Sequence, residues 1–182
     1  MKILKDNPSL DYDLSICGLG FESRAIASYD KAQEHIKDLI VLGYKKNTSK
    51  FSYQDNKLFF EDKTDYIFEV EDDEVISVLD IQLNELGFDK PLNVLLDITV
   101  MSRHRLATIL SLLIDKLKEN SSLSVTYTLS KFIDPPSGTT PVKKVCEISE
   151  GFEGVIGDLS LPTSVIIGLG YEKGKALSLI HI

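Results

Sequence analysis

Apolar residues fall along the chain in short unbroken runs, separated by polar segments or by segments of helical periodicity. Unbroken apolar runs are typical of strands that are buried on both faces of a parallel sheet. They predict strands over residues 12–17, 39–42, 92–98, 142–148 and 164–167, and an alternating pattern predicts another over 123–129. Residues 57–60 and 66–70 are predicted as short strands or a hairpin.

Helical spacing of apolar residues marks three further segments, over residues 22–37, 73–86 and 102–120. Gly87 is expected to end the second of these helices, and the polar segment 45–56 is predicted as a loop. Strands and helices in alternation predict an α/β, Rossmann-like fold whose mainly parallel sheet carries helices on both faces. Ligands bind such sheets at the carboxyl ends of the strands, near a topological switch point, so candidate residues are sought there.

The composition suits a globular protein, because 43% of the 182 residues are hydrophobic and can bury a core. No apolar run approaches the roughly 18 residues of a membrane span, and residues 1–13 lack the apolar stretch of a secretory signal. We therefore expect a cytoplasmic protein without a membrane partner. Cys17 and Cys146 both lie in apolar runs, and we interpret them as buried free thiols.

The net charge of −8 belongs to one segment of the chain. Residues 55–90 hold 12 acids and 3 lysines, a balance of −9, whereas the remainder holds 16 acids and 17 bases, a balance of +1. Most of the chain is thus near neutral, which leaves a site there free to bind an anion. The acids from Glu69 to Glu74 are interpreted as a solvated helix start rather than a metal site, because no His or Cys lies nearby.

The first candidate loop follows the strand at 12–17 and contains Gly18, Gly20, Glu22 and Arg24. Glycines let a backbone approach a ligand closely, and a helix that begins here would offer amide groups to an anion. Glu22 could accept a ribose hydroxyl, and Arg24 could hold a phosphate. The alternative is a tight strand-to-helix turn, because Ser23 stands at the third glycine position of the dinucleotide-binding pattern.

The second candidate loop follows the strand at 92–98. Asp97 ends that strand, and Arg103 and Arg105 lie at the start of the next helix, where cations oppose the helix dipole. One interpretation is an anion held by Arg103 or Arg105, with Asp97, Thr99 and Ser102 as hydrogen-bonding groups. The other is that Asp97 caps the helix or pairs with Arg103, while Arg105 is solvated.

A third loop repeats the first. The pattern I-x-G-L-G-[FY]-E occurs at residues 16–22 and again at 166–172, with Gly168, Gly170 and Glu172 at the corresponding positions. This repeat predicts that a Rossmann-like domain over residues 1–160 is followed by the start of a second, truncated unit over 161–176. Residues 177–182 match the translation of a sequencing adapter, CTG TCT CTT ATA CAC ATC, and are expected to be a non-native tail.

The order of elements resembles that of the CARF group, the Rossmann-like ligand-sensing domains of prokaryotic defence proteins. A strand is followed by a G-x-G-type loop and a helix, and a later strand ends in Asp-x-Thr. In that group a D-x-T-G-G-T-K-like turn contacts a cyclic oligonucleotide. Asp97 and Thr99 match this turn, whereas Val100 and Met101 replace its glycines and Arg103 is the nearest cation. The resemblance implies a domain that senses a ligand.

The leading hypothesis is a cytoplasmic α/β domain that binds a nucleotide-like or phosphorylated small ligand at the strand ends, as a sensor in a prokaryotic defence system. One alternative is a nucleotide-processing enzyme, a hydrolase or glycosyl transferase, with Glu22 or Asp97 as general base. Another is a protein-interaction module that presents its acidic segment, residues 55–90, to a basic partner. The sequence identifies no cofactor, metal site or strong nucleic-acid signal, and it is compatible with a homo-oligomer.

Overall fold

The computed structural model describes residues 10–87 and 89–131, together with Ile148 and Ser160. The chain divides into two compact units, Met1–Ser130 and Lys131–Ile182, and all helices and strands described below belong to the first. Several sequence predictions lie outside the described residues. These are the strand at 164–167, most of that at 142–148, Cys146, the repeated turn with Gly168, Gly170 and Glu172, and the tail at 177–182.

The first unit is an α/β fold of the Rossmann-like kind, as the sequence predicts. Its strands are β1 (Tyr12–Leu19), β2 (Ile36–Tyr44), β3 (Ile67–Val70), β4 (Asn93–Asp97) and β5 (Ser122–Thr126). Its helices are α1 (Ala27–Ala32), with short 3₁₀ turns at Ser23–Ile26 and Gln33–His35, α2 (Tyr53–Glu61), α3 (Val75–Glu85) and α4 (Arg103–Lys116).

The five strands form one parallel sheet in the order β3-β2-β1-β4-β5. The chain adds β2 and β3 on one side of β1 and then returns to add β4 on the other side. The loops after β1 and β4 therefore leave the sheet in opposite directions. This is the topological switch point at which sheets of this kind bind ligands.

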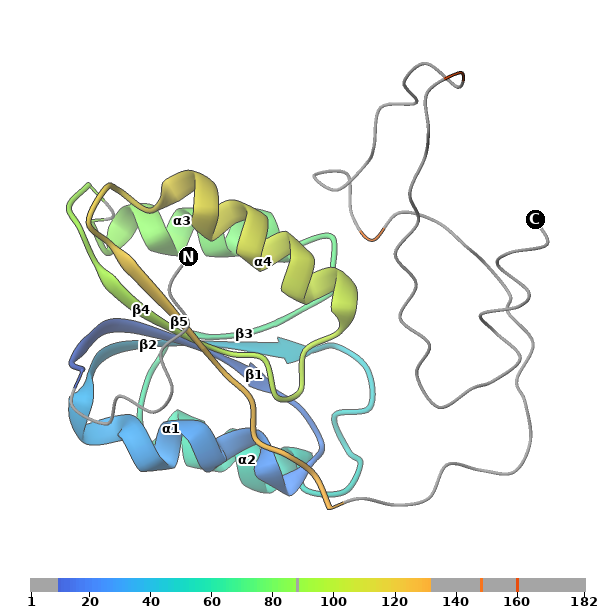
Figure 1. The fold of residues 1–182 in the computed structure, drawn as a ribbon. Coiled ribbons are helices and arrows are strands. Elements are labelled where there is room, and N and C mark those ends of the chain that lie inside the picture. The colour runs from blue at the N-terminus through green and yellow to red at the C-terminus, as the bar shows by residue number, and fades with distance from the viewer. Residues whose placement is uncertain (1–9, 88, 132–147, 149–159, 161–182) are drawn as a thin grey trace. The chain divides into compact units, whose positions relative to one another are not determined.

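Helices cover both faces of the sheet, α1 and α2 on one face and α3 and α4 on the other (Figure 1). Because successive side chains of a strand point to opposite faces, Ile16 packs with α3 and α4, whereas Cys17 packs with α1 and α2. Cys17 is buried and free, as predicted, and burial raises the pKa of its thiol to about 12. A thiol held neutral in this way is chemically inert.

Helix α2 differs from the sequence prediction. The pattern predicts a loop over residues 53–56 and a strand over 57–60, but Tyr53–Glu61 is helical. Its buried side chains are Tyr53, Asn56 and Phe60. Because this stripe is narrow and includes a polar residue, the helical pattern of apolar residues is hard to recognise in the sequence. The helix predicted over 22–37 is shorter and more irregular than expected, because Ile36 already opens β2.

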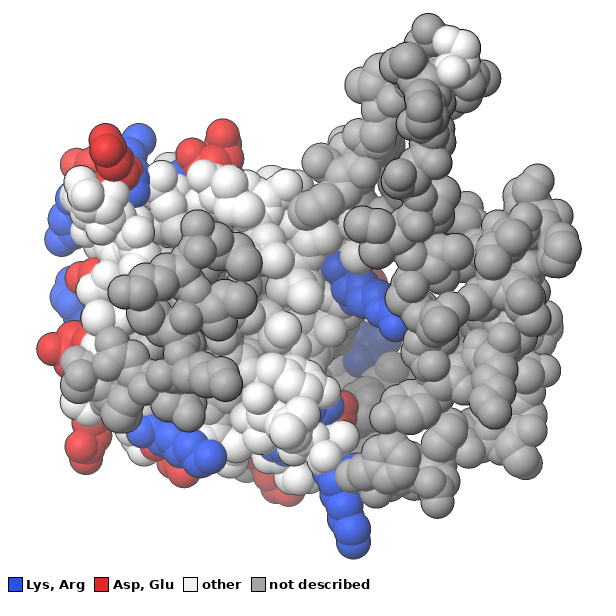
Figure 2. Space-filling model, in the orientation of Figure 1, with Lys and Arg blue, Asp and Glu red and all other residues white. Residues whose placement is uncertain are grey.

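The other helices agree better with the sequence. Gly87 follows α3 with a positive φ of 75°, the backbone conformation with which glycine commonly ends a helix. Among the described residues, no helix is long and apolar enough to cross a membrane. On the face shown in Figure 2, basic and acidic side chains of the described surface are interspersed.

Candidate functional site

A cavity of about 610 Å³ opens at the carboxyl ends of the strands, over the switch point. It is lined by the loops after β1, β2 and β4, by Glu71 after β3 and by Tyr127 after β5. We call it the switch-point pocket. Its volume lies in the range of small-molecule sites, and its position is the one that the strand order predicts for a ligand.

Five of the predicted site residues line the switch-point pocket, and they come from both candidate loops. They are Gly20, Glu22, Arg24, Thr99 and Ser102. The two loops are about 80 residues apart in sequence, and the parallel pairing of β1 with β4 brings them together. The two candidate loops therefore meet in one pocket, and their binding of a ligand stays a prediction.

Three other predicted residues do not line the pocket. Gly18 is buried beneath it, Asp97 is buried at the end of β4, and Arg103 is exposed on the first turn of α4. The cation that the sequence left undecided, Arg105, is fully buried inside the protein. Arg105 is therefore neither solvated nor placed to hold an anion in the pocket.

The two glycines of the first loop make room for a side chain of the second loop. A Cβ atom on Gly18 would lie 2.9 Å from Val100 Cγ2, and a Cβ atom on Gly20 would lie 2.9 Å from Val100 Cβ. Real Cβ atoms do not approach neighbours so closely, so a side chain at either position would have to displace Val100. Val100 thus fills the space beside Gly18 and Gly20 in which a glycine-rich loop would hold a phosphate.

Asp97 is a buried acid beneath the pocket, with 1% of its surface exposed. Its Oδ1 atom accepts a hydrogen bond from the Thr99 amide at 2.9 Å, while Oδ2 has no partner among the described residues. Burial raises the pKa of the Asp97 carboxyl, and the hydrogen bonds from Thr99 oppose this shift. Asp97 does not cap α4, because the Ser102 hydroxyl accepts the hydrogen bond from the Arg105 amide.

Asp97→Asn is expected to flatten the dependence of stability on pH. The pKa of Asp97 is higher in the folded than in the unfolded state, so the protonated Asp97 stabilises the folded protein. This stabilisation is complete below the pKa of the unfolded state, about 4. It is lost as the pH rises through the pKa of the folded state. Urea unfolding followed by circular dichroism should therefore show a smaller loss of unfolding free energy from about pH 4 to 7 in the variant. Asp89→Asn, at an exposed position, is the control, and equal slopes in wild type and Asp97→Asn would contradict the prediction.

The buried Arg105 joins the ends of two strands to α4. Its guanidinium donates hydrogen bonds to the carbonyls of Leu42 and Gly43 in β2 and of Val70 in β3, at 2.8–3.2 Å. Its Nε atom donates to Asp72 Oδ1 at 2.9 Å. These bonds give a buried cation the partners that it needs.

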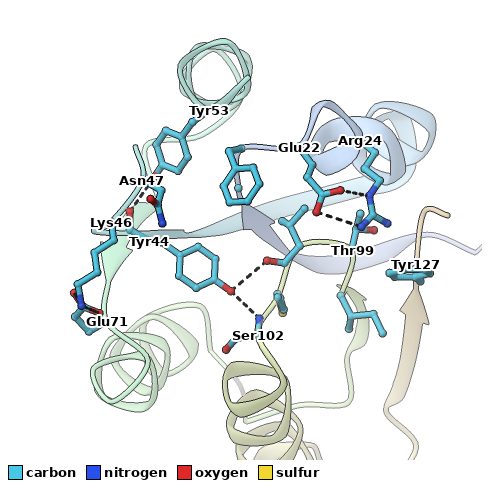
Figure 3. A pocket seen from close by; sticks show the side chains of 15 residues that line it. Glu22, Arg24, Tyr44, Lys46, Asn47, Tyr53, Glu71, Thr99, Ser102 and Tyr127 are labelled. Carbon is cyan, nitrogen blue, oxygen red and sulfur yellow. Dashed lines mark hydrogen bonds and ion pairs between the residues drawn. The ribbon is translucent and has the colours of Figure 1, made fainter. Parts of the chain in front are cut away.

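Tyr44 connects this buried group to the floor of the pocket. Arg105 lies 3.8 Å from the centre of the Tyr44 ring, and the Tyr44 hydroxyl donates to the Val100 carbonyl at 3.2 Å. The same hydroxyl accepts a hydrogen bond from the Ser102 amide at 2.7 Å (Figure 3). The Ser102 hydroxyl in turn donates to Asp72 at 2.7 Å. The loops after β2, β3 and β4 are thus held together by one network.

Two ion pairs lie at opposite sides of the pocket (Figure 3). On one side, Arg24 donates to both carboxylate oxygens of Glu22, at 2.8 and 3.3 Å, which raises the pKa of Arg24. The Arg24 guanidinium also donates to the Thr128 carbonyl and lies 5.1 Å from the centre of the Tyr127 ring. On the other side, Lys46 pairs with Glu71 at 3.3 Å.

The acidic residues at the end of β3 and directly after it are likewise paired with cations. The pairs are Glu69 with Lys57, Glu71 with Lys46, Asp72 with Arg105 and Glu74 with Lys45. Within the described ranges, no group of three or more His, Cys, Asp or Glu side chains is placed to hold a metal ion. These ion pairs link the run to α2, to α4 and to the loop after β2.

The sequence analysis missed the aromatic residues of the pocket, which are Phe21, Tyr44, Tyr53 and Tyr127. A signal for three of them was available. Phe21 follows β1 by two residues, Tyr44 is the last residue of β2, and Tyr127 follows β5 directly. Aromatic side chains at the carboxyl ends of parallel strands lie where a ligand binds.

The comparisons with known proteins add no assignment. No protein-family model matches the chain, and no curated protein matches it either. What the protein binds must therefore be argued from the geometry and chemistry of the switch-point pocket.

Proposed function

We propose that the first unit binds a nucleotide-like small ligand in the switch-point pocket and acts as a ligand-sensing domain. The observation that carries this proposal is the combination of aromatic rings with paired polar groups at the switch point of a parallel sheet. A planar base stacks favourably on aromatic side chains, and ribose hydroxyls need hydrogen-bond partners at the edge of such a site.

The pocket offers both kinds of contact. Tyr44 is fixed by its two hydrogen bonds and is backed by Arg105, so its ring is a preorganised surface for a base. Tyr127 presents a second ring on the opposite side, near Arg24 (Figure 3). The Glu22 carboxylate and the Thr99 hydroxyl are the groups that we assign to the sugar.

Binding without turnover is favoured over the enzyme hypothesis by the surroundings of the two acids that could serve as general base. Both oxygens of Glu22 already accept hydrogen bonds from Arg24. Asp97 does not line the pocket. A ligand that is bound and left intact is a signal, which agrees with the resemblance to the sensing domains of prokaryotic defence proteins.

The proposal is tested by titrating the full chain with nucleosides and nucleotides in a calorimeter. Tyr127→Ala is expected to weaken binding by about fivefold to tenfold, because it removes one stacking surface. Tyr66→Ala is the matched control: Tyr66 is also partly exposed (41%, against 49% for Tyr127) but does not line the pocket. Chromatography of the recovered ligand should show no product.

Two outcomes would contradict the proposal. One is that no nucleoside or nucleotide binds, and the other is that the two tyrosine variants weaken binding equally. Conversion of the ligand, abolished by Glu22→Gln with binding retained, would favour the enzyme hypothesis instead.

A further inference from the structure

Two places where a sheet of this kind usually holds phosphates are filled in part by the protein's own groups. The Val100 side chain fills the space beside Gly18 and Gly20. At the start of α4, the Ser102 hydroxyl accepts the Arg105 amide and the Ser102 amide donates to Tyr44. Phosphate binding at a helix start depends on amides that have no partner, and these two amides have one.

The two cations that line the pocket, and the buried Arg105 beneath it, are also engaged. Arg24 uses three of its five N–H groups, two on Glu22 and one on Thr128. Arg105 is buried and bonded to backbone carbonyls and Asp72. Lys46 is exposed and lies beside Glu71.

The charges of the pocket lining therefore cancel. Its cations are Arg24 and Lys46, and its anions are Glu22 and Glu71. The acidic run that follows β3 lies next to it, in the segment that carries a balance of −9. Such surroundings give no net attraction to a polyphosphate, and each added phosphate charge meets the Glu22 and Glu71 carboxylates.

We infer that the switch-point pocket selects a nucleoside or a nucleoside monophosphate and discriminates against nucleoside di- and triphosphates. The inference rests on the proposed function and specifies its ligand class. The base is held by the aromatic rings, and a single phosphate reaches the two unused N–H groups of Arg24. A longer phosphate chain would have to turn to Lys46, the other cation that lines the pocket, and Lys46 has the Glu71 carboxylate beside it.

The test compares wild type with Glu22→Gln for the four common nucleosides and their mono-, di- and triphosphates, by calorimetry at low and at moderate salt. In wild type, no triphosphate should bind more than about twofold more tightly than its nucleoside, and affinity should depend little on salt. Glu22→Gln removes one carboxylate charge and should raise the ratio of triphosphate to nucleoside affinity about fivefold.

Glu85→Gln is the matched control, because it makes the same change of net charge on α3, away from the pocket lining. Its affinity ratio should equal that of wild type. If wild type binds a triphosphate tenfold more tightly than the nucleoside, or if Glu22→Gln leaves the ratio unchanged, the inference is overturned while the proposed function stands. If no compound of the series binds wild type, the proposed function fails, and the inference fails with it.

Discussion

Arg105→Met is expected to lower the free energy of unfolding by about 3–5 kcal/mol, the usual cost of removing one partner from a buried ionic group. The variant would leave the carbonyls of Leu42, Gly43 and Val70 without their side-chain donor and Asp72 without its cation. Urea unfolding followed by circular dichroism is the appropriate measurement, since the chain contains no tryptophan.

The neighbouring arginine supplies the control. Arg103 lies on the same turn of α4 but is exposed, so Arg103→Met should change stability by less than about 0.5 kcal/mol. Arg105→Lys keeps the charge but lacks the planar fork that reaches several carbonyls at once, and it should recover only part of the loss. Equal stability of the two methionine variants would show that the buried network contributes nothing.

Gly18→Ala is expected to destabilise the protein by about 1–3 kcal/mol, because its new methyl group would overlap with Val100. The clash is specific: Val100 Cγ2 would lie 2.9 Å from the added Cβ atom. Removing Cγ2 should relieve it. The double variant Gly18→Ala/Val100→Ala should therefore be about 1 kcal/mol more stable than the sum of the two single losses predicts.

Gly87→Ala tests whether this coupling is local. Gly87 has a φ of 75°, so alanine is strained there, but the nearest atom to an added Cβ would be Asp89 Oδ1 at 3.6 Å, an ordinary contact. Its loss of about 1 kcal/mol should be the same in the wild-type background and in the Val100→Ala background. Strict additivity for Gly18 as well would contradict the role assigned to Val100.

The sequence was sufficient for the fold class because the strands of a parallel sheet are apolar on both faces and stand out in the pattern. It was insufficient for α2, where a buried polar residue interrupts the helical stripe. Asn56 is buried because its side-chain amide donates to the carbonyls of Gly20 and Glu22, both at 2.9 Å. Its place in the core depends on a loop more than 30 residues away, which no local pattern can reveal.

The candidate site, like the fold, could be predicted only in part from the sequence. The strand-end rule located the loops that contain Gly20 and Ser102, but it could not say which charged residue was buried. For Arg105 a signal was present, because Ile109 and Leu113 follow it at intervals of four and are both buried on the same face of α4. An arginine that continues an apolar stripe is expected to be buried when backbone carbonyls in the core can accept its hydrogen bonds.

The hydrogen bond from Arg24 to the carbonyl of Thr128 bears on the proposed sensing role. Thr128 lies two residues before Ser130, the last residue of the first unit. Arg24, which lines the pocket, therefore holds the chain close to the end of that unit. The floor around Tyr44 is fixed by its own network, whereas Arg24 can exchange partners with a ligand. In the proposed sensing role, a ligand that contacts Arg24 would therefore compete with the hydrogen bond that holds the chain at Thr128.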